Sequence, residues 1–402
     1  MATRRFILAG MFIDGSAADA RRNIMLTVKN GIITAINPAA QLQASDDAPL
    51  NDLSHCTILP ALVDCSVSLS RSPAIDPKTR LAYEESGPAI KAAMLERHIH
   101  DYHAHGVRGV ADCDDITRLV KDYQDRMAEE SIIDIKASGP LCQARHSAAD
   151  NRENDDFLKI AYSADIAAGE PPRSRLSHED LRYILQLRGG KKAVVVANGR
   201  QQVAEALAAG CDAIEQGYAM GEDNLKKMAD KSVLWIPNLL RARNALDGAG
   251  RGGDVGCRFS HRYAAPEKLL PGTEAFWQKT LHEQLKQLNL ARELGLTTAV
   301  GTGAGSIGIL HGESMAEEMK LFIKSGYTRE ETIRCASDNG ARFFGMETLG
   351  ALTVGRRATF LLTRGTVQQL PRKLSYLEGI YVDGVPSPIY HKNPVKLVNQ
   401  VS

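Results

Sequence analysis

The chain has 402 residues, enough to bury a large core and to form one α/β barrel with a smaller second domain. Its 49 Lys and Arg residues nearly balance its 48 Asp and Glu residues, so the net charge is +1. A charge so close to zero creates no overall field that would attract nucleic acid or an anionic membrane, and we expect neither as a partner.

Seven cysteines are scattered along the sequence without a C-x-x-C pair. An odd number at irregular spacing predicts reduced, mostly buried thiols and no disulfide framework. The apolar run at residues 6–10 turns polar by Asp14, which is too short for a signal peptide, and no stretch is apolar for long enough to span a bilayer. We therefore expect a cytoplasmic protein.

Sequence runs typical of β-strands occur near both ends of the chain, at residues 5–13, 24–28, 32–36, 359–363 and 379–384. Asn30 and Gly31 lie between two of these runs and favour a hairpin turn with positive φ angles. The early strands need additional partners, which the late ones can supply. The pattern predicts a small β-sandwich domain built from residues 1–57 and 348–402.

Between these ends, short apolar strands alternate with amphipathic helices, the pattern of a parallel sheet with crossover helices. The expected strands lie near residues 58–67, 106–113, 131–138, 155–163, 192–197, 211–216, 232–237 and 297–302. Eight such units predict an α/β fold with a closed (β/α)8 TIM-like barrel over residues 58–347. Helices are expected to start at Ser177 and Thr328, and the second to continue through Phe344.

Residues 60–64, with the sequence Pro-Ala-Leu-Val-Asp, resemble the Pro-Gly-Leu-Ile-Asp segment of the amidohydrolase superfamily. In that family a His-x-His pair follows at the end of the first barrel strand and binds metal. Here the two positions are Ser66 and Ser68, which alternation along a strand would direct into the barrel mouth. Residues 193–199, 211–217 and 299–305 resemble later family strands, and their metal-ligand positions read Val196, Gln216 and Gly303.

The resemblance extends to residues 350–360, which look like the family segment that returns to the small β domain, and to His311. The sequence around His311 is similar to the prolidase-like and imidazolonepropionase-like branches. None of the five ligand positions carries an imidazole or a carboxylate, so we expect no metal cofactor. The resemblance thus implies an amidohydrolase-like pseudoenzyme that binds a small molecule or acts as a non-catalytic subunit, in a homodimer or beside an active paralogue.

Two alternatives keep catalysis. The first is a metal-independent hydrolase, lactonase or isomerase that acts on C–N or C–O bonds through Lys159 and His311. The second is a metallohydrolase that uses the histidine cluster at residues 98–105. This cluster precedes the second barrel strand, which would place it on the outer or N-terminal side, so a solvated or interface helix is the favoured interpretation.

Lys159 aligns with a lysine that some family branches carboxylate to bridge two metal ions. A buried amine must lose its charge or meet a carboxylate. Lys159 is therefore either a Schiff-base or acid–base residue or, as we favour, the partner of a neighbour such as Glu215. His311 either lines a pocket or orders the helix that begins near Ser314.

Other polar residues suggest ligand binding. Ser66, Ser68 and Gln216, together with Asn198, predict a neutral pocket lined by hydrogen-bonding groups. The long Gly-rich segment 238–272 is expected to be a loop, either a solvated one or one that binds a carboxylate or phosphate through its arginines. The candidate anion-binding residues in it are Arg241, Arg243 and Arg258.

Overall fold

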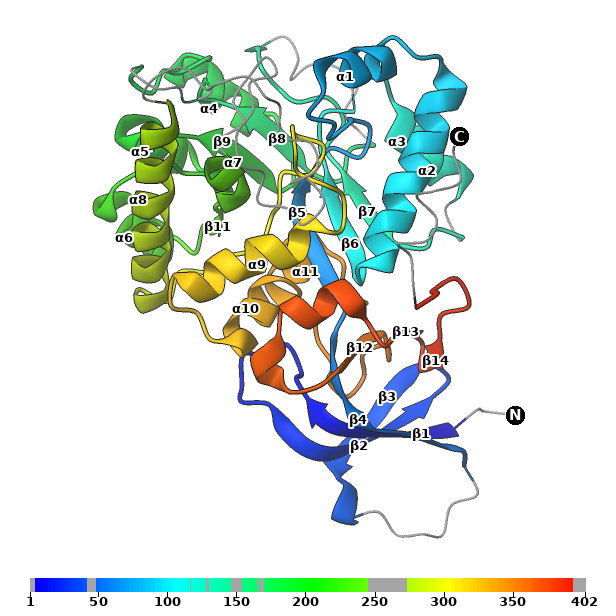
Figure 1. The fold of residues 1–402 in the computed structure, drawn as a ribbon. Coiled ribbons are helices and arrows are strands. Elements are labelled where there is room, and N and C mark those ends of the chain that lie inside the picture. Colours follow the sequence, from blue (N-terminus) through cyan, green and yellow to red (C-terminus); the bar gives the residue numbers. More distant parts are fainter. Residues whose placement is uncertain are drawn as a thin grey trace.

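The computed structural model describes residues 4–41, 48–115, 117–127, 130–145, 154–164, 166, 170–244 and 273–392. Figure 1 shows two parts, a group of parallel strands surrounded by helices and a second sheet formed by the first and last strands of the chain. The prediction of an α/β fold is confirmed.

The second sheet has seven strands in the order β14-β13-β12-β4-β1-β2-β3. Its strands are β1 (Arg4–Phe12), β2 (Arg21–Lys29), β3 (Ile32–Pro38), β4 (Leu50–Pro60), β12 (Phe360–Arg364), β13 (Gly379–Val382) and β14 (Val385–Pro386). Strand β12 pairs antiparallel with β4, so segments from both chain ends share one sheet. The domain boundaries after residues 57 and 347 stay predictions.

This sheet curls on itself. Ala358 N donates to Gly31 O at 2.7 Å, and Gly384 N donates to Ala358 O at 2.8 Å, which joins the β2–β3 turn to the β13–β14 turn. Asn30 and Gly31 have φ angles of 51° and 79°, as the predicted hairpin turn requires. A single curled sheet with an apolar interior therefore stands where the sequence predicted a sandwich.

The parallel strands form two sheets. One contains β5 (Leu62–Val67), β6 (Val107–Asp112) and β7 (Asp134–Ala137), and the other contains β8 (Leu158–Ala161), β9 (Ala193–Ala197), β10 (Ala213–Gln216) and β11 (Leu234–Ile236). They are buried on both faces, as expected for parallel strands covered by helices. We call the region at their carboxyl ends, which holds Ser66, Cys113, Lys159, Glu215 and Asn238, the mouth.

Backbone hydrogen bonds outside the regular ladders link the two parallel sheets on both sides. Segment 297–302 accepts a bond from Trp235 N at Thr297 O and one from Cys65 N at Val300 O, both at 3.0 Å, so it lies between β11 and β5. On the other side, Cys142 N donates to Lys159 O at 3.0 Å. Regular ladders do not continue around the described strands, and the closed barrel stays a prediction.

The helices are α1 (Pro77–Glu84), α2 (Pro88–Ala104), α3 (Leu119–Arg126), α4 (His178–Gln186), α5 (Arg200–Ala209), α6 (Glu222–Asp230), α7 (Leu239–Asn244), α8 (Thr273–Glu293), α9 (Ser314–Lys324), α10 (Arg329–Cys335) and α11 (Asp338–Phe343). Both predicted helix starts are confirmed: Ser177 caps α4, and Thr328 forms a capping box with Glu331 at α10. No helix among the described residues is long and apolar enough to cross a membrane.

Three predicted boundaries are wrong. The strand near 58–67 is divided, because β4 pairs with β12 in the curled sheet up to Pro60, whereas Leu62 N already bonds to Gly106 O beside β6. The helix from Thr328 breaks at Ser337, whose hydroxyl donates to Ile333 O at 2.6 Å and whose backbone is not helical. The segment from residue 238 opens with helix α7 and not with a loop.

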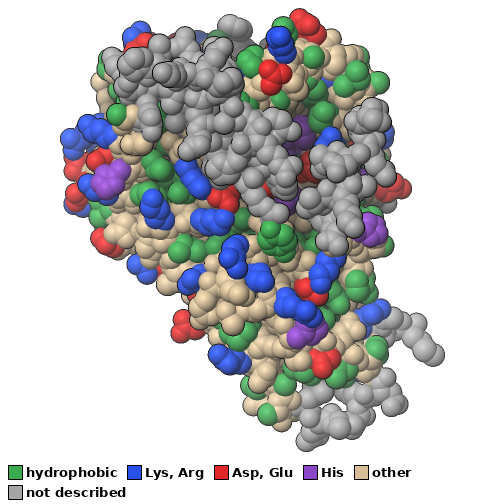
Figure 2. Space-filling model, viewed as in Figure 1, with side chains coloured by type: hydrophobic (Ala, Val, Ile, Leu, Met, Phe, Trp, Pro, Cys, Tyr) green, Lys and Arg blue, Asp and Glu red, His purple; other side chains and the backbone are tan. Residues whose placement is uncertain are grey.

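The face shown in Figure 2 carries Lys and Arg side chains across its middle, over α9 and α10, with hydrophobic side chains scattered among them. Helix α9 contains Lys320 and Lys324, and helix α10 contains Arg334. Lys320 is neutralised in part by an ion pair with Glu317 one turn earlier. Acidic side chains therefore offset part of the basic charge of these helices, in agreement with the net charge of +1.

Candidate functional site

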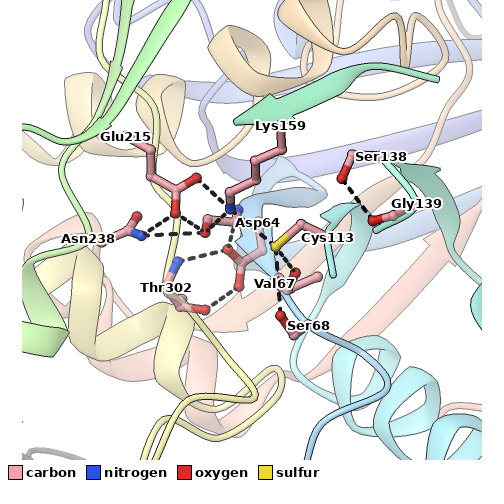
Figure 3. A network of polar contacts seen from close by, with 11 residues as sticks. Asp64, Val67, Ser68, Cys113, Ser138, Gly139, Lys159, Glu215, Asn238 and Thr302 are labelled. Atoms are coloured by element: carbon pink, nitrogen blue, oxygen red, sulfur yellow. Dashed lines mark hydrogen bonds and ion pairs between the residues drawn. The ribbon is translucent and has the colours of Figure 1, made fainter. Parts of the chain in front are cut away.

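Lys159 and Glu215 form the centre of the mouth, as Figure 3 shows. Lys159 from β8 places Nζ 2.6 Å from Glu215 Oε2 on β10. The two side chains are only 6% and 5% exposed, so this ion pair is almost entirely removed from water. The predicted pairing of Lys159 with Glu215 is confirmed, and the Schiff-base or acid–base role stays an untested prediction.

Ser66 and Asn238 complete the surroundings of the Glu215 carboxylate. Ser66 Oγ and Asn238 Nδ2 each donate to Glu215 Oε1 at 2.9 Å. Lys159 Nζ also donates to Ser66 Oγ at 3.4 Å. Ser66, which stands where the family has its first metal-binding histidine, thus holds the buried Glu215 carboxylate in place.

Cys113, which directly follows β6, is the third partner of the lysine. Lys159 Nζ lies 3.1 Å from Cys113 Sγ, and the thiol donates to Val67 O at 3.1 Å. Burial opposes the charge on Lys159, but the attraction of Cys113 and Glu215 outweighs it and raises the pKa of the amine above its ordinary value. Burial raises the pKa of the Cys113 thiol, against the opposing attraction of Lys159. At neutral pH the lysine is therefore an ammonium ion and the cysteine a thiol.

Asp64 ties the first parallel strand to segment 297–302. Thr302 donates to its carboxylate twice, from N to Oδ1 at 2.8 Å and from Oγ1 to Oδ2 at 2.6 Å, and Tyr102 OH donates to Oδ2 at 3.2 Å. Burial raises the pKa of Asp64 to about 6, although these hydrogen bonds lower it. Asp64 Oδ1 also accepts from Ser66 N at 3.4 Å and so positions the neighbouring mouth residue.

The remaining ligand positions are neutral. Gln216 has a φ of 68° and accepts from Asn198 Nδ2 at 2.6 Å, while Asn198 Oδ1 accepts from Tyr218 N at 3.0 Å. Val196 is partly buried. A Cβ added at Gly303 would find no atom closer than 3.8 Å, although its φ of 73° strains most other residues. One hydrogen bond thus joins the two amides, and a Cβ at Gly303 would meet Asn238, Ser306 and Ile309 at ordinary van der Waals distance.

His311 is buried behind the mouth, only 3% exposed. Its Nε2 donates to Ser68 O at 3.1 Å, and its ring stacks on His98, whose Nδ1 donates to Leu69 O at 2.8 Å. Burial lowers the pKa of both imidazoles, that of His98 to about 4 and that of His311 well below its ordinary value, so both are neutral at pH 7. Together they fix the chain that follows β5, including Ser68. A catalytic role for His311 stays a prediction.

The predicted helix at residues 98–105, expected to be solvated or at an interface, is not solvated at two of its histidines. His98 and His103 on α2 are 4% and 2% exposed. His98 faces the chain after β5, whereas His103 Nε2 lies 3.1 Å from Ser387 Oγ beside the curled sheet. Helix α2 is buried on one face over its second half, from Leu95 to His103, which is why some of the cluster is buried. The histidines point to different parts of the molecule and do not converge.

Helix α7 holds two of the three candidate anion-binding arginines. Arg243 NH1 donates to Glu317 Oε2 at 2.8 Å, so its charge is already paired. Arg241 lies on the same helix, and Arg258 lies outside the described residues. Anion binding by these three residues stays a prediction.

Glu318 fixes the start of α7. Its carboxylate, fully buried on α9, accepts from Leu239 N at 2.7 Å and from Leu240 N at 2.8 Å, which satisfies two amides at a helix N-terminus. Burial raises the pKa of Glu318 to about 8, although the two amides lower it. The carboxyl group therefore titrates near neutral pH.

Comparison with known proteins agrees with this architecture. The family model described as "Amidohydrolase family" matches residues 191–388. The structure of a Xaa-Pro dipeptidase with bound methionine superposes with a TM-score of 0.79 at 17% identity, over 96% of this chain and 100% of the other. Residues 191–388 thus match the amidohydrolase family, and the chain as a whole has the fold of amidohydrolase structures. No curated protein sequence matches it significantly.

Other solved amidohydrolase-type structures share the fold at similarly low identity. The ochratoxinase of A. niger has a TM-score of 0.75 at 17% identity, with 96% of this chain and 95% of the other covered. A putative prolidase from Bifidobacterium longum has a TM-score of 0.75 at 18% identity, with coverage of 96% and 94%. At these identities the likeness establishes the fold of this chain and leaves its substrate open.

The mouth of this protein does not fit a metal ion. Ser66, Ser68 and Gln216 offer neutral hydroxyl and amide groups, which are poor substitutes for imidazole or carboxylate. The remaining carboxylate, Glu215, is neutralised by the Lys159 ammonium at 2.6 Å, a positive charge that would repel a cation. Within the described part of the chain, no three His, Cys, Asp or Glu side chains form a group that could hold a metal.

Several residues of the mouth were missed by the sequence analysis: Asp64, Tyr102, Cys113, Asn238, Thr302 and Glu318. Asp64, Cys113 and Asn238 lie within or directly after β5, β6 and β11. Polar residues at the carboxyl end of a parallel strand are a recognisable signal for this location. Tyr102 and Glu318 come from helices, and no local pattern distinguishes them from other helical residues.

Proposed function

We propose that this protein is an amidohydrolase-superfamily member that has lost metal-dependent hydrolysis and binds a small molecule at its mouth. The single observation that carries the proposal is the buried ion pair of Lys159 and Glu215, which occupies the centre of the mouth. Metal ions in hydrolases lower the pKa of bound water and polarise the scissile group. Ser66, Ser68 and Gln216 form no set of metal ligands, and the Glu215 carboxylate is paired with Lys159.

The side chains of the mouth favour a neutral, polar ligand. Ser68 is partly exposed, and Asn238, Ser306 and Ile309 lie around Gly303, at van der Waals distance from where a Cβ would stand. Hydroxyl and amide groups around a small apolar surface are typical of ligand pockets. Because several structural neighbours are named as a dipeptidase or a prolidase, amides and small peptide-like molecules are the first compounds to test.

Metal analysis and an activity panel test the proposal. We expect protein purified without chelator to contain far less than one equivalent of zinc, iron, manganese or cobalt. Dipeptides, N-acyl amino acids and lactones should be hydrolysed at the rate of buffer alone. Stoichiometric metal that is lost together with an activity on chelation would overturn the proposal.

The alternative proposal is a metal-independent hydrolase, lactonase or isomerase that uses Lys159 and His311. Its two residues are poorly placed for it, since the lysine is paired with Glu215 and His311 is 3% exposed and bonded to Ser68. Activity that survives chelation and disappears in both Lys159→Arg and His311→Gln would establish this alternative. Retained activity in either variant would exclude it.

We further propose that the protein functions in association, as a homodimer or with an active paralogue, in the cytoplasm. The folded framework keeps its capped helices and buried strands although the metal ligands are replaced. This is expected if the protein functions through its surface and not through metal-dependent catalysis. Light scattering at micromolar concentration measures the oligomeric state directly. A monomer that also fails to recover an amidohydrolase paralogue in affinity purification would contradict this part.

A further inference from the structure

Lys159 and Cys113 form a pair that the proposed ligand-binding function does not use. Nζ and Sγ are 3.1 Å apart, at the carboxyl ends of β8 and β6. Cys113 is a free cysteine and remains 7% exposed, next to the partly exposed Ser68, whose hydroxyl lies 3.7 Å from Sγ. A lysine nitrogen held in contact with a free thiol is the arrangement needed for a covalent link between the two side chains.

We propose that Lys159 and Cys113 are a modification site, at which hydrogen peroxide produces a reversible sulfur–nitrogen cross-link. In the first step, peroxide oxidises the Cys113 thiol to a sulfenic acid and is itself reduced to water. In the second step, Lys159 Nζ attacks Sγ, the S–N bond forms, and the S–O bond breaks as water leaves. Sulfenic acids condense with nitrogen nucleophiles in this way when one is held in contact.

Glu215 supplies the proton acceptor that the second step requires. An ammonium ion has no free electron pair, and Lys159 must release two protons in total: one leaves with the departing oxygen as water, and the other passes to Glu215 Oε2, 2.6 Å from Nζ. The transfer replaces a buried ion pair by two neutral groups, which lowers the cost of burial. Glu215 is therefore a positioning residue for the lysine and a base for the cross-linking step.

The cross-link would change the mouth. The linked nitrogen carries no full positive charge, so Glu215 loses its ionic partner while Ser66 and Asn238 continue to donate to Oε1. Strands β6 and β8 become joined by a covalent bond. Two equivalents of a thiol reductant restore the free thiol and amine and are oxidised to a disulfide. The cross-link is thus suited to act as a reversible redox switch that controls ligand binding at the mouth.

Mass spectrometry of the full chain tests the proposal. Mild peroxide treatment should lower the intact mass by about 2 Da, and dithiothreitol should restore it. Proteolytic fragments should contain Cys113 joined to Lys159, with no cleavage after Lys159. Fragment analysis of the wild-type protein identifies the link directly, so the result does not depend on a variant that folds or on the assays for lost hydrolysis.

Three variants sharpen the result. Cys113→Ser and Lys159→Arg should abolish the link, and Cys56→Ser, which removes a buried cysteine of the curled sheet, should leave it intact. Oxidised Cys113, heavier by about 16 or 32 Da, beside an unlinked Lys159 would overturn the proposal. So would a link from Cys113 to another cysteine. An increase of about 14 Da on the linked pair would show an oxygen retained between nitrogen and sulfur and would overturn the direct bond.

Discussion

The imidazole rings of His98 and His311 stack, with their centroids 3.7 Å apart and an angle of 19° between their planes. His98 lies on helix α2, whereas His311 lies in the segment just before helix α9. Each ring donates to a backbone carbonyl after β5, His98 to Leu69 and His311 to Ser68. Two charged imidazoles could not stack at this distance without strong repulsion. The packing behind the mouth therefore requires both rings to be neutral.

The first prediction concerns the protonation of this pair. The folded pKa of His98 is lowered to about 4 by burial, so in the window from pH 6.5 to 4 the unfolded chain binds more protons than the folded one. The stability contributed by the neutral ring is present above this window and is lost as the pH falls through it. In an NMR titration, His98 should stay neutral to below pH 5. A midpoint for His98 near 6.5 would contradict the prediction.

The second prediction concerns the central ion pair. Lys159→Met should lower the free energy of unfolding by about 3–5 kcal/mol, because Glu215 is left buried without its partner. The double variant Lys159→Met/Glu215→Leu should recover much of this loss, since neither charge remains to be buried. Urea unfolding of the single and double variants measures both effects.

Arg200 and Asp223 provide the control for the ion pair. Their side chains are 69% and 63% exposed, so Arg200→Met should cost at most about 1 kcal/mol. An equal loss of unfolding free energy in Lys159→Met and Arg200→Met would show that the Lys159 charge does not stabilise the buried Glu215 carboxylate.

The third prediction is a dependence of stability on pH through Glu318. Its folded pKa is raised from 4.5 to about 8, so between these values the folded state holds a proton that the unfolded state has released. This group therefore makes the protein less stable as the pH rises from about 5 to 8, by at most about 1.4 kcal/mol per pH unit. The difference in unfolding free energy between wild type and Glu318→Gln should change with pH accordingly. Glu96→Gln alters a largely exposed carboxylate, so its difference in unfolding free energy from wild type should not show this dependence on pH.

The fourth prediction concerns the close packing beneath the mouth. A Cβ at Gly301 would lie 2.4 Å from Ile236 Cγ2 and 3.0 Å from Ser66 Cβ. Gly301→Ala should therefore destabilise the protein by about 1–3 kcal/mol and displace Ser66. Gly190→Ala, where a Cβ would meet no atom within 4 Å, should be nearly neutral. Equal thermal unfolding midpoints for the two variants would refute the prediction.

Local sequence patterns determined much of the framework. The alternation of short apolar strands with helices predicted the α/β fold, Asn30-Gly31 predicted its hairpin, and Thr328 with Glu331 predicted the start of α10. These features depend on neighbours within a few residues, such as turn conformation and capping hydrogen bonds, so the sequence is sufficient. The resemblance also located Ser66 and Gln216 in the mouth.

The tertiary structure alone decided how the mouth is neutralised. Cys113, Lys159 and Glu215 come from β6, β8 and β10, and their contacts arise because the carboxyl ends of parallel strands meet at one edge. The break at Ser337 and the burial of His98 were likewise set by packing, which overrides local helix preference and places a polar side chain inside when a partner is there. A sequence specifies which groups are present. Only the folded chain brings an ammonium ion, a carboxylate and a thiol within hydrogen-bonding distance of one another, and that proximity fixes their charge.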